Sequence, residues 1–211
     1  MKLTDLFSFN RLAADRLCRV LVKTPLRPNH ITTLSLLSGA AGAFAASRGH
    51  VAGMLACAAF LHLRFILDNC DGTIARMKGL SSAFGMWYDL AADVSADLML
   101  WAGLAVGAVR IGHSESVFAF AGAAAFGSLM QFAGVVRERT RKIRQAAAEP
   151  GRRNEALALL YVLNHDGDPS LLTWVLAPVL GPYFFVICAA VYMNILWTSS
   201  AVFSRSALWR L

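Results

Sequence analysis

The sequence predicts an all-α integral membrane protein with six transmembrane helices, preceded by an N-terminal amphipathic helix at the membrane interface. Of its 211 residues, 57% are hydrophobic and 16% are charged, and the mean hydropathy is +0.53. A soluble domain would carry about 25% charged residues. Several apolar runs also approach the roughly 20 residues that cross a bilayer. Six crossings fill most of the chain and leave no room for a second sizeable soluble domain.

Residues 1–24 mix leucines, valines and Phe7 with lysines and arginines, which predicts an amphipathic helix. We interpret it as a helix on the membrane surface; the alternative is an ordinary helix packed on a protein core. Pro25 and Pro28 end it. The expected organisation is therefore an amphipathic helix over 1–27, a six-helix transmembrane catalytic domain over 28–205 and a short cytoplasmic tail over 206–211.

The apolar runs define the six predicted spans, at about 30–47, 51–75, 84–109, 115–136, 154–178 and 182–203. Asn29 is the expected N-cap of the first. Gly79, Ser81 and Ser82 predict a short turn between the second and third, and the basic stretch 137–153 is expected to be a loop. The segment 165–169, with a histidine and two aspartates, resembles a metal cluster, but we interpret it as a polar kink or loop.

The positively charged residues predict the orientation of the chain. If the N-terminus is cytoplasmic, 17 of the 20 lysines and arginines fall on the inside. Arg48 and Arg110 fall outside, and Arg64 lies within a span. Because cytoplasmic loops carry an excess of Lys and Arg, we expect an integral protein of the cell inner or plasma membrane with a cytoplasmic N-terminus.

The same charge distribution bears on partners. The net charge is +7, but the charges lie between apolar segments, where they suit topology and lipid headgroups. We expect a lipid bilayer as partner and no nucleic acid. The four cysteines are scattered and are expected to be free thiols. The first 27 residues lack the apolar core of a cleavable signal peptide.

Residues 68–93 hold four aspartates at helical spacing. Asp68 and Asp71 share one helix face, and Asp89 and Asp93 share another. Two facing helices would bring four carboxylates together, and such a cluster needs a cation. Hard ions such as Mg²⁺ or Mn²⁺ prefer these oxygens, and two ions about 3.5–4 Å apart can clamp a diphosphate.

Small and basic residues accompany the acids. Gly72 allows a pyrophosphate to approach the backbone, Ala75 keeps the same face small, and Gly85 does the equivalent at the start of the third span. Arg76 supplies a fork for phosphate. Together with the acids, these residues predict a nucleotide-diphosphate site at the cytoplasmic end of spans two and three.

The complete pattern resembles the signature of the CDP-alcohol phosphatidyltransferase family, whose fixed positions are all filled: Asp68, Asp71, Gly72, Ala75, Arg76, Gly85, Asp89 and Asp93. The resemblance implies transfer of a phosphatidyl-type group from a CDP-linked lipid such as CDP-diacylglycerol to an alcohol, with release of CMP. It implies a two-metal Mg²⁺ or Mn²⁺ site in which Asp68, Asp71, Asp89 and Asp93 are ligands and Asp93 is the general base. It also implies that Asn29 and Thr32 lie near the nucleotide, and that the protein is a homodimer.

The acceptor is less defined by the sequence. Five arginines of the basic stretch are candidates for binding a phosphorylated alcohol such as glycerol 3-phosphate or an inositol phosphate: Arg137, Arg139, Arg141, Arg152 and Arg153. The alternative is that they only set topology and contact anionic lipid. Val94 stands where inositol-phosphate-type members carry arginine, and the run common in glycerophosphate-type members is absent.

Two questions stay open at this stage. Arg64 and His62 precede the motif, and Arg64 either pairs with Asp68 or lines the lipid-phosphate cavity. The rival to a phospholipid-synthesis enzyme is a cation-binding membrane transporter that uses the intramembrane aspartates. A cation path has no use for Arg76 and two small residues beside its acids, so the enzyme is favoured. Intact acids also argue against an inactive relative.

Overall fold

A computed structural model describes residues 16–148, 180–195 and 198. Within these ranges the chain is helical and contains no strand. The elements are α2 (Pro28–Ala46), α3 (Val51–Met77), α4 (Ala83–Arg110) and α5 (Val117–Ala148), followed by the helix Leu180–Ile195. Residues 16–21 are also helical. The first four predicted spans therefore correspond to α2 to α5, and the fifth (154–178) lies outside the described residues.

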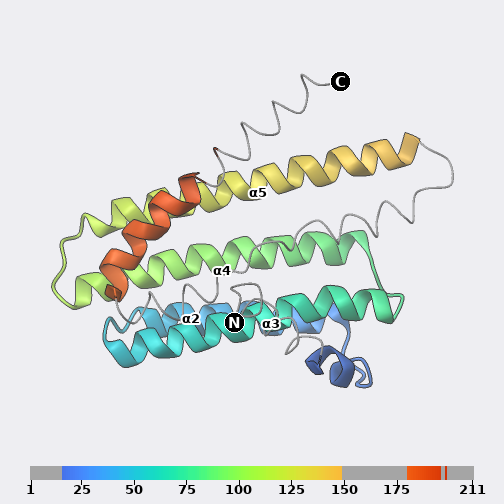
Figure 1. The fold of residues 1–211 in the computed structure, drawn as a ribbon, viewed down its shortest axis with the longest axis horizontal. Coiled ribbons are helices and arrows are strands. Elements are labelled where there is room, and N and C mark those ends of the chain that lie inside the picture. The colour runs from blue at the N-terminus through green and yellow to red at the C-terminus, as the bar shows by residue number, and fades with distance from the viewer. Residues whose placement is uncertain (1–15, 149–179, 196–197, 199–211) are drawn as a thin grey trace, which may run out of the picture.

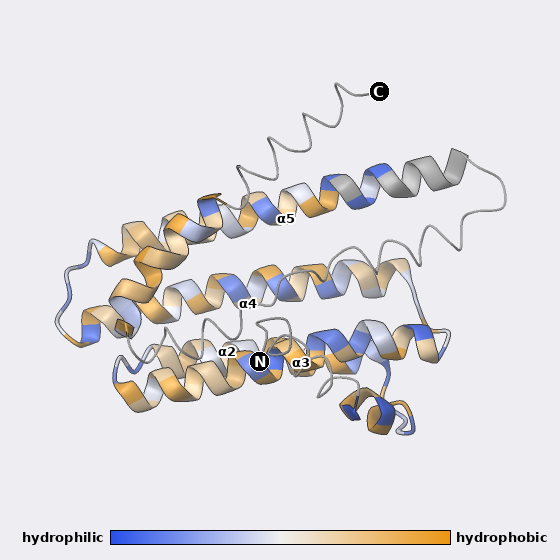
Figure 2. Ribbon diagram, viewed as in Figure 1, coloured by the Kyte–Doolittle hydropathy of each residue, from blue (hydrophilic) through white to orange (hydrophobic). Residues whose placement is uncertain are grey.

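Successive helices run in opposite directions, and α2 packs against both α3 and α4 (Figure 1). The start of α2, the end of α3 and the start of α4 consequently lie at one end of the bundle, which we call the motif end. Figure 2 shows hydrophilic residues along the part of α3 nearest that end and along the middle of α4, while the opposite end of α3 is mainly hydrophobic. The two halves of the acidic motif are thus brought together by the antiparallel arrangement.

Close contact between α2 and α4 depends on two glycines of α4. A Cβ atom on Gly103 would lie 2.2 Å from the carbonyl oxygen of Ala43, and one on Gly107 would lie 2.2 Å from that of Ala46. Neither distance leaves room for a methyl group, so only glycine permits this approach of the two backbones. Small residues at helix interfaces are typical of membrane bundles, because packing drives association there.

Side-chain hydrogen bonds join the helices further. From α2, Ser38 donates to the carbonyl of Phe60 at 2.8 Å and Ser35 donates to that of Arg64 at 3.1 Å. On the other side, the Trp101 indole N–H donates to Ser128 Oγ at 3.0 Å, which links α4 to α5. These polar contacts sit among buried apolar residues and fix the helices relative to one another.

The helices begin and end where turn chemistry requires. The Nδ1 of His50 accepts the Gly53 N–H at the start of α3, and Ser82 Oγ accepts the Gly85 N–H at the start of α4, both at 3.0 Å. Gly49 and Gly79 have φ angles of +76° and +64°, which side chains other than glycine rarely adopt. The turn predicted at Gly79–Ser82 is therefore confirmed.

Three of the described helical segments are long and apolar enough to cross a membrane: α3, α4 and Val117–Arg141 of α5. Leu180–Ile195 is apolar but shorter. For the described residues, an all-helical architecture with helices long and apolar enough to span a membrane is confirmed. The count of six spans remains a prediction, because residues 149–179 and most of those after 195 lie outside the described part.

Two expectations about helix ends were wrong. The basic stretch does not begin a loop at Arg137, since α5 continues to Ala148. Arginine, lysine, glutamine and alanine are good helix formers, and the first breaker is Pro150. Nor is Asn29 the N-cap of α2. Arg27 takes that place and Pro28 follows at the first helical position, where its fixed φ and missing N–H cost nothing.

The segment 16–21 packs on α2 and α3 through the face that carries Cys18. Cys18 is buried in a cluster with Ile31 of α2 and Leu67, Cys70 and Ile74 of α3. The Sγ atoms of Cys18 and Cys70 are 2.6 Å apart, and all four cysteines are thiols, as expected. Most of the predicted amphipathic helix lies in residues 1–15, outside the described part, so its place on a membrane surface remains a prediction.

Candidate active site

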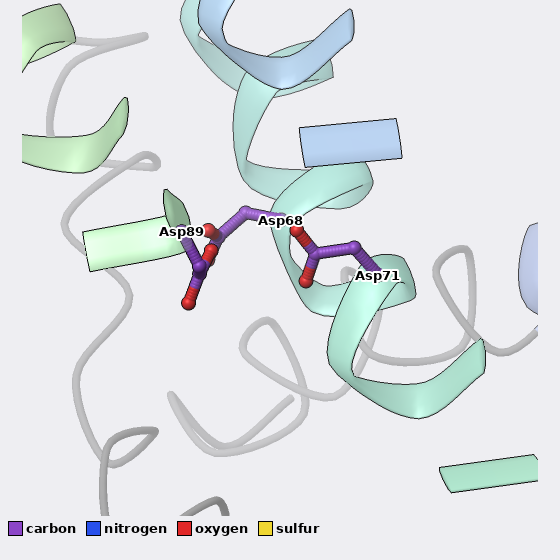
Figure 3. A group of neighbouring side chains, drawn as sticks. All are labelled: Asp68, Asp71 and Asp89. Carbon is purple, nitrogen blue, oxygen red and sulfur yellow. The ribbon is translucent and has the colours of Figure 1, made fainter. Parts of the chain in front are cut away.

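Three carboxylates from two helices converge at the motif end. Asp68 and Asp71 lie on α3, and Asp89 lies on α4. Each can offer an oxygen within 4.8 Å of the others, and Figure 3 shows the three side chains pointing toward one another. We refer to these three residues as the aspartate cluster. On α3, the Asp71 side chain is buried and accepts a hydrogen bond from Thr32, which fixes its position.

The donor set suits a hard divalent ion. Carboxylate oxygens are the ligands that Mg²⁺ and Mn²⁺ prefer, and three anionic groups this close repel one another without a cation. The spacing therefore fits the predicted ions. The fourth acid of the motif, Asp93, is not part of this group in the described residues, although its charge interacts with that of Asp68.

The start of α2 completes the wall beside the cluster. The Thr32 hydroxyl donates to Asp71 Oδ2 at 2.5 Å. Asn29 Oδ1 would be 3.3 Å from a Cβ atom on Gly85, so a side chain at Gly85 would crowd the amide. Thr33 and Tyr88 add a hydroxyl–hydroxyl contact of 2.8 Å between α2 and α4. Asn29 and Thr32 thus lie beside the two halves of the motif, and their place near a nucleotide remains a prediction.

The remaining residues predicted for the nucleotide lie on the last turns of α3. Gly72 and Ala75 are buried inside the helix packing. Arg76 is exposed, and its guanidinium donates to Thr73 Oγ1 at 3.2 Å. An exposed guanidinium at the end of α3 can turn toward a phosphate that enters from the motif end.

Lys78 ties the chain before α2 to the end of α3, a contact that the sequence did not predict. Its ammonium donates to the carbonyl oxygens of Thr24 and Leu26, each at 2.7 Å. These carbonyls are available because Pro25 and Pro28 keep the segment out of a helix. The contact fixes the segment that leads directly into Asn29.

Arg64 lies one turn before Asp68 on α3 and reaches α4. Its Nη2 donates to Asp93 Oδ1 at 2.9 Å and to the Asp93 carbonyl oxygen at 3.2 Å, and its Nη1 lies 3.5 Å from Asp97. The recorded ion pairs of Arg64 are thus with α4, not with Asp68. Asp97 was missed as a partner, although its place four residues after Asp93 puts it on the same face.

The five arginines predicted for the acceptor differ in environment. Arg139 is 8% exposed, and its positive charge acts on the Asp89 carboxylate. Arg137 and Arg141 are exposed on α5. Arg152 and Arg153 lie outside the described residues, as do His165, Asp166 and Asp168. The extension of α5 past residue 136 is what carries Arg139 toward the aspartate cluster.

A model of the CDP-alcohol phosphatidyltransferase family matches residues 26–188, which is more than half of the chain. The chain belongs to this family. The predicted family and its transferase class are therefore confirmed, and with them an association with phospholipid biosynthesis and membranes. Membership favours an enzyme over a transporter, and the family depends on metal.

Individual relatives of this phosphatidyltransferase-family chain were also found. The bifunctional IPC transferase and DIPP synthase of Rubrobacter xylanophilus is 38% identical over 106 residues, which are 49% of this chain and 23% of that protein. The present chain thus matches less than a quarter of that relative's length. Among solved structures, the apo phosphatidylinositol phosphate synthase of Mycobacterium tuberculosis aligns with a TM-score of 0.47 and 19% identity, over 88% of this chain and 94% of that one.

Proposed function

We propose that this chain transfers a substituted phosphate group from a CDP-linked lipid, such as CDP-diacylglycerol, to an alcohol acceptor and releases CMP. The observation that carries the proposal is the convergence of Asp68, Asp71 and Asp89 beside Thr32 in a member of this family. Three helices supply these residues at one end of an apolar bundle. A soluble nucleotide can enter that end while the lipid chains remain in the bilayer.

Asp68, Asp71 and Asp89 are proposed to hold two Mg²⁺ or Mn²⁺ ions, with Asp93 as a further ligand. Bound ions would neutralise charge on the diphosphate and on departing CMP. The acceptor oxygen forms a bond to the phosphorus on the lipid side, the bond from that phosphorus to the CMP oxygen breaks, and Asp93 takes the acceptor proton. A carboxylate within hydrogen-bond reach of the attacking hydroxyl can do this without a covalent enzyme intermediate.

The nucleotide is proposed to lie between the start of α2 and the aspartate cluster. Asn29 and Thr32 form one side, and the small residues Gly72, Ala75 and Gly85 leave room for the diphosphate. Arg76 contributes a positive fork at the open end. The position of Asn29 Oδ1, 3.3 Å from where a Cβ atom on Gly85 would stand, supports this placement, because it brings α2 close to the second half of the motif.

For the acceptor we propose a phosphorylated alcohol of the glycerol 3-phosphate or inositol phosphate type. Arg139 is the best supported of the predicted arginines, since it is buried and acts on Asp89. A guanidinium buried this close to the aspartate cluster can also bind a phosphate that enters the site. Arg137, Arg141, Arg152 and Arg153 remain candidates that bind the acceptor or only contribute to topology.

We further propose six spans behind an amphipathic helix at the membrane interface, with the N-terminus and the motif end in the cytoplasm. The support is the excess of Lys and Arg in the segments assigned to that side. The catalytic domain is proposed to be residues 28–205, and the assembly a homodimer by resemblance to the family.

The proposed reaction is tested by an acceptor screen. Purified protein in detergent or vesicles receives CDP-diacylglycerol, Mg²⁺ and one alcohol at a time, and CMP release is followed. We expect release with a phosphorylated alcohol, and none from Asp71→Asn under the same conditions. CMP release that Asp71→Asn leaves unchanged would contradict the proposal, as would the absence of release with every phosphorylated alcohol tested.

A further inference from the structure

Arg64, Asp93 and Asp97 form a second polar layer below the aspartate cluster. Arg64 precedes Asp68 by four residues on α3, and Asp93 follows Asp89 by four on α4. At 1.5 Å per residue, each lies about 6 Å further along its helix, away from the motif end. Placing an arginine this deep in a membrane-spanning helix costs free energy, and such an arginine normally has a function. The proposed reaction has so far given Arg64 none.

The contact with Asp93 has a specific geometry. One nitrogen, Nη2 of Arg64, donates to both the side-chain Oδ1 and the main-chain carbonyl oxygen of Asp93. A donor shared between these two atoms holds the carboxylate close to its own backbone. It therefore restricts the rotation of the Asp93 side chain, which a simple counter-charge would not need to do. Asp97 meets the other guanidinium nitrogen at the longer distance of 3.5 Å.

The Asp93 side chain also lies against Asp68, with which it interacts both as a like charge and through a side-chain hydrogen bond. The charge-assisted hydrogen bond from Arg64 fixes the Asp93 carboxylate in that position. Arg64 thus keeps Asp93 next to Asp68, where a reacting phosphate and its acceptor must come together.

The packing around Arg64 is suited to a fixed side chain. A Cβ atom on Gly39 would lie 3.1 Å from Arg64 Cδ and 2.8 Å from Ala96 Cβ, so glycine on α2 leaves room for the arginine stem. Ser35 bonds the Arg64 carbonyl from the same helix. The Arg64 side chain is 20% exposed. Its position is therefore set by α2 and α4 together.

We propose that Arg64 is a positioning residue for Asp93: it holds the carboxylate in the orientation that accepts the acceptor proton. This inference rests on the proposed function, in which Asp93 is the base. It assigns Arg64 no contact with the nucleotide or the lipid phosphate. Removing Arg64 should therefore lower the rate of the chemical step and leave substrate affinity unchanged.

The first experiment compares Arg64→Gln with the full-length wild type in CMP release. We expect kcat to fall about 10- to 100-fold, the scale on which misplacement of a reacting group acts, with the KM values for CDP-diacylglycerol and acceptor nearly unchanged. Arg110→Gln is the matched control, because Arg110 bonds the Ser47 carbonyl at the far end of α4. Unchanged kcat in Arg64→Gln, or a rise in KM for either substrate that accounts for the loss, would overturn the proposal.

A double variant tests whether Arg64 acts through Asp93. If it does, Arg64→Gln combined with Asp93→Asn should be no slower than Asp93→Asn alone, since the group being positioned is already lost. Losses that multiply would overturn the proposal. The contact itself is tested without turnover by melting temperatures of the same four proteins: coupled shifts support it, and additive shifts contradict it.

Arg64→Lys is a second variant for the same measurement, used if Arg64→Gln does not fold. Lysine retains the charge but is a point donor and not a fork, so we expect a smaller fall in kcat at unchanged KM. Wild-type kcat in a folded Arg64→Lys would overturn the proposal. Failure of the proposed function is recognised separately, because the wild type itself would then release no CMP, or Asp93→Asn alone would keep its rate.

Discussion

The hydroxyl of Thr32 on α2 donates a hydrogen bond to the buried carboxylate of Asp71 on α3. This contact joins the start of α2 to the acidic motif, across 39 residues of sequence. Thr32, which is expected near the nucleotide, therefore contacts Asp71, which is expected to bind metal. The two proposed parts of the site are therefore mechanically connected.

Thr32→Val should destabilise the metal-free protein. Valine keeps the shape but removes the donor, and a buried polar group left without its partner costs about 1–3 kcal/mol. We expect a lower melting temperature in the absence of divalent ions. Thr32→Ser, which keeps the hydroxyl, is the control and should melt close to the wild type; equal melting of all three proteins would show that the bond contributes nothing.

Substituting any member of the aspartate cluster should abolish turnover. Asp68→Asn, Asp71→Asn and Asp89→Asn each remove a ligand and a charge from a shared site. Mg²⁺ or Mn²⁺ should raise the melting temperature of the wild type, because an ion that binds only the folded state stabilises it. That rise should shrink in each variant. Near-normal activity of one variant at ordinary Mg²⁺ would contradict a shared metal site.

Among the described arginines of α5, Arg139 should matter most for the acceptor. A hydrogen bond to a charged group is worth roughly 1.5–3 kcal/mol, or about ten- to a hundredfold in binding. We expect Arg139→Ala to raise the acceptor KM by that factor with little change for CDP-diacylglycerol. The exposed Arg137 and Arg141 provide matched alanine controls. If the three variants change the acceptor KM equally, the buried position of Arg139 next to Asp89 gives it no special role in binding the acceptor.

Glycines at the α2–α4 contact should not tolerate alanine. Gly103→Ala or Gly107→Ala puts a methyl group against a backbone carbonyl, and overpacking typically costs about 1–3 kcal/mol. We expect a clear drop in melting temperature for both. Gly122→Ala on α5 meets no atom within 4 Å and should leave stability unchanged or slightly raised, since alanine favours helix. A drop for Gly122→Ala as large as the others would indicate a general helix effect.

Sequence reasoning predicted the elements well where the pattern was periodic and long. The apolar runs predicted α2, α3, α4 and the first part of α5, and the spacing of the aspartates predicted that Asp68, Asp71 and Asp89 converge. The predicted fourth member, Asp93, lies outside this group and pairs with Arg64. Helix ends were less predictable. Pro28 at the first helical position displaced the expected cap at Asn29, and charged residues that read as a loop extended α5 to Ala148.

Contacts between distant segments could not be read from spacing. The two carbonyls bound by Lys78 carry no signal in their side chains, and the pairing of Arg64 with Asp93 depends on how α3 faces α4. The sequence left two alternatives for Arg64, a pair with Asp68 at i, i+4 or a place in the lipid-phosphate cavity. The two recorded ion pairs are instead with α4, since α2 holds the two helices at the distance that a guanidinium spans.

The central claim is that the aspartate cluster and the start of α2 form one metal-dependent nucleotide site. The most direct measurement is binding of CDP or CMP to the purified protein, with and without Mg²⁺ or Mn²⁺, alongside Asp71→Asn. The account predicts binding only when a divalent ion is present, and none in the variant. Equal binding with and without metal, or undiminished metal-dependent binding in Asp71→Asn, would contradict it.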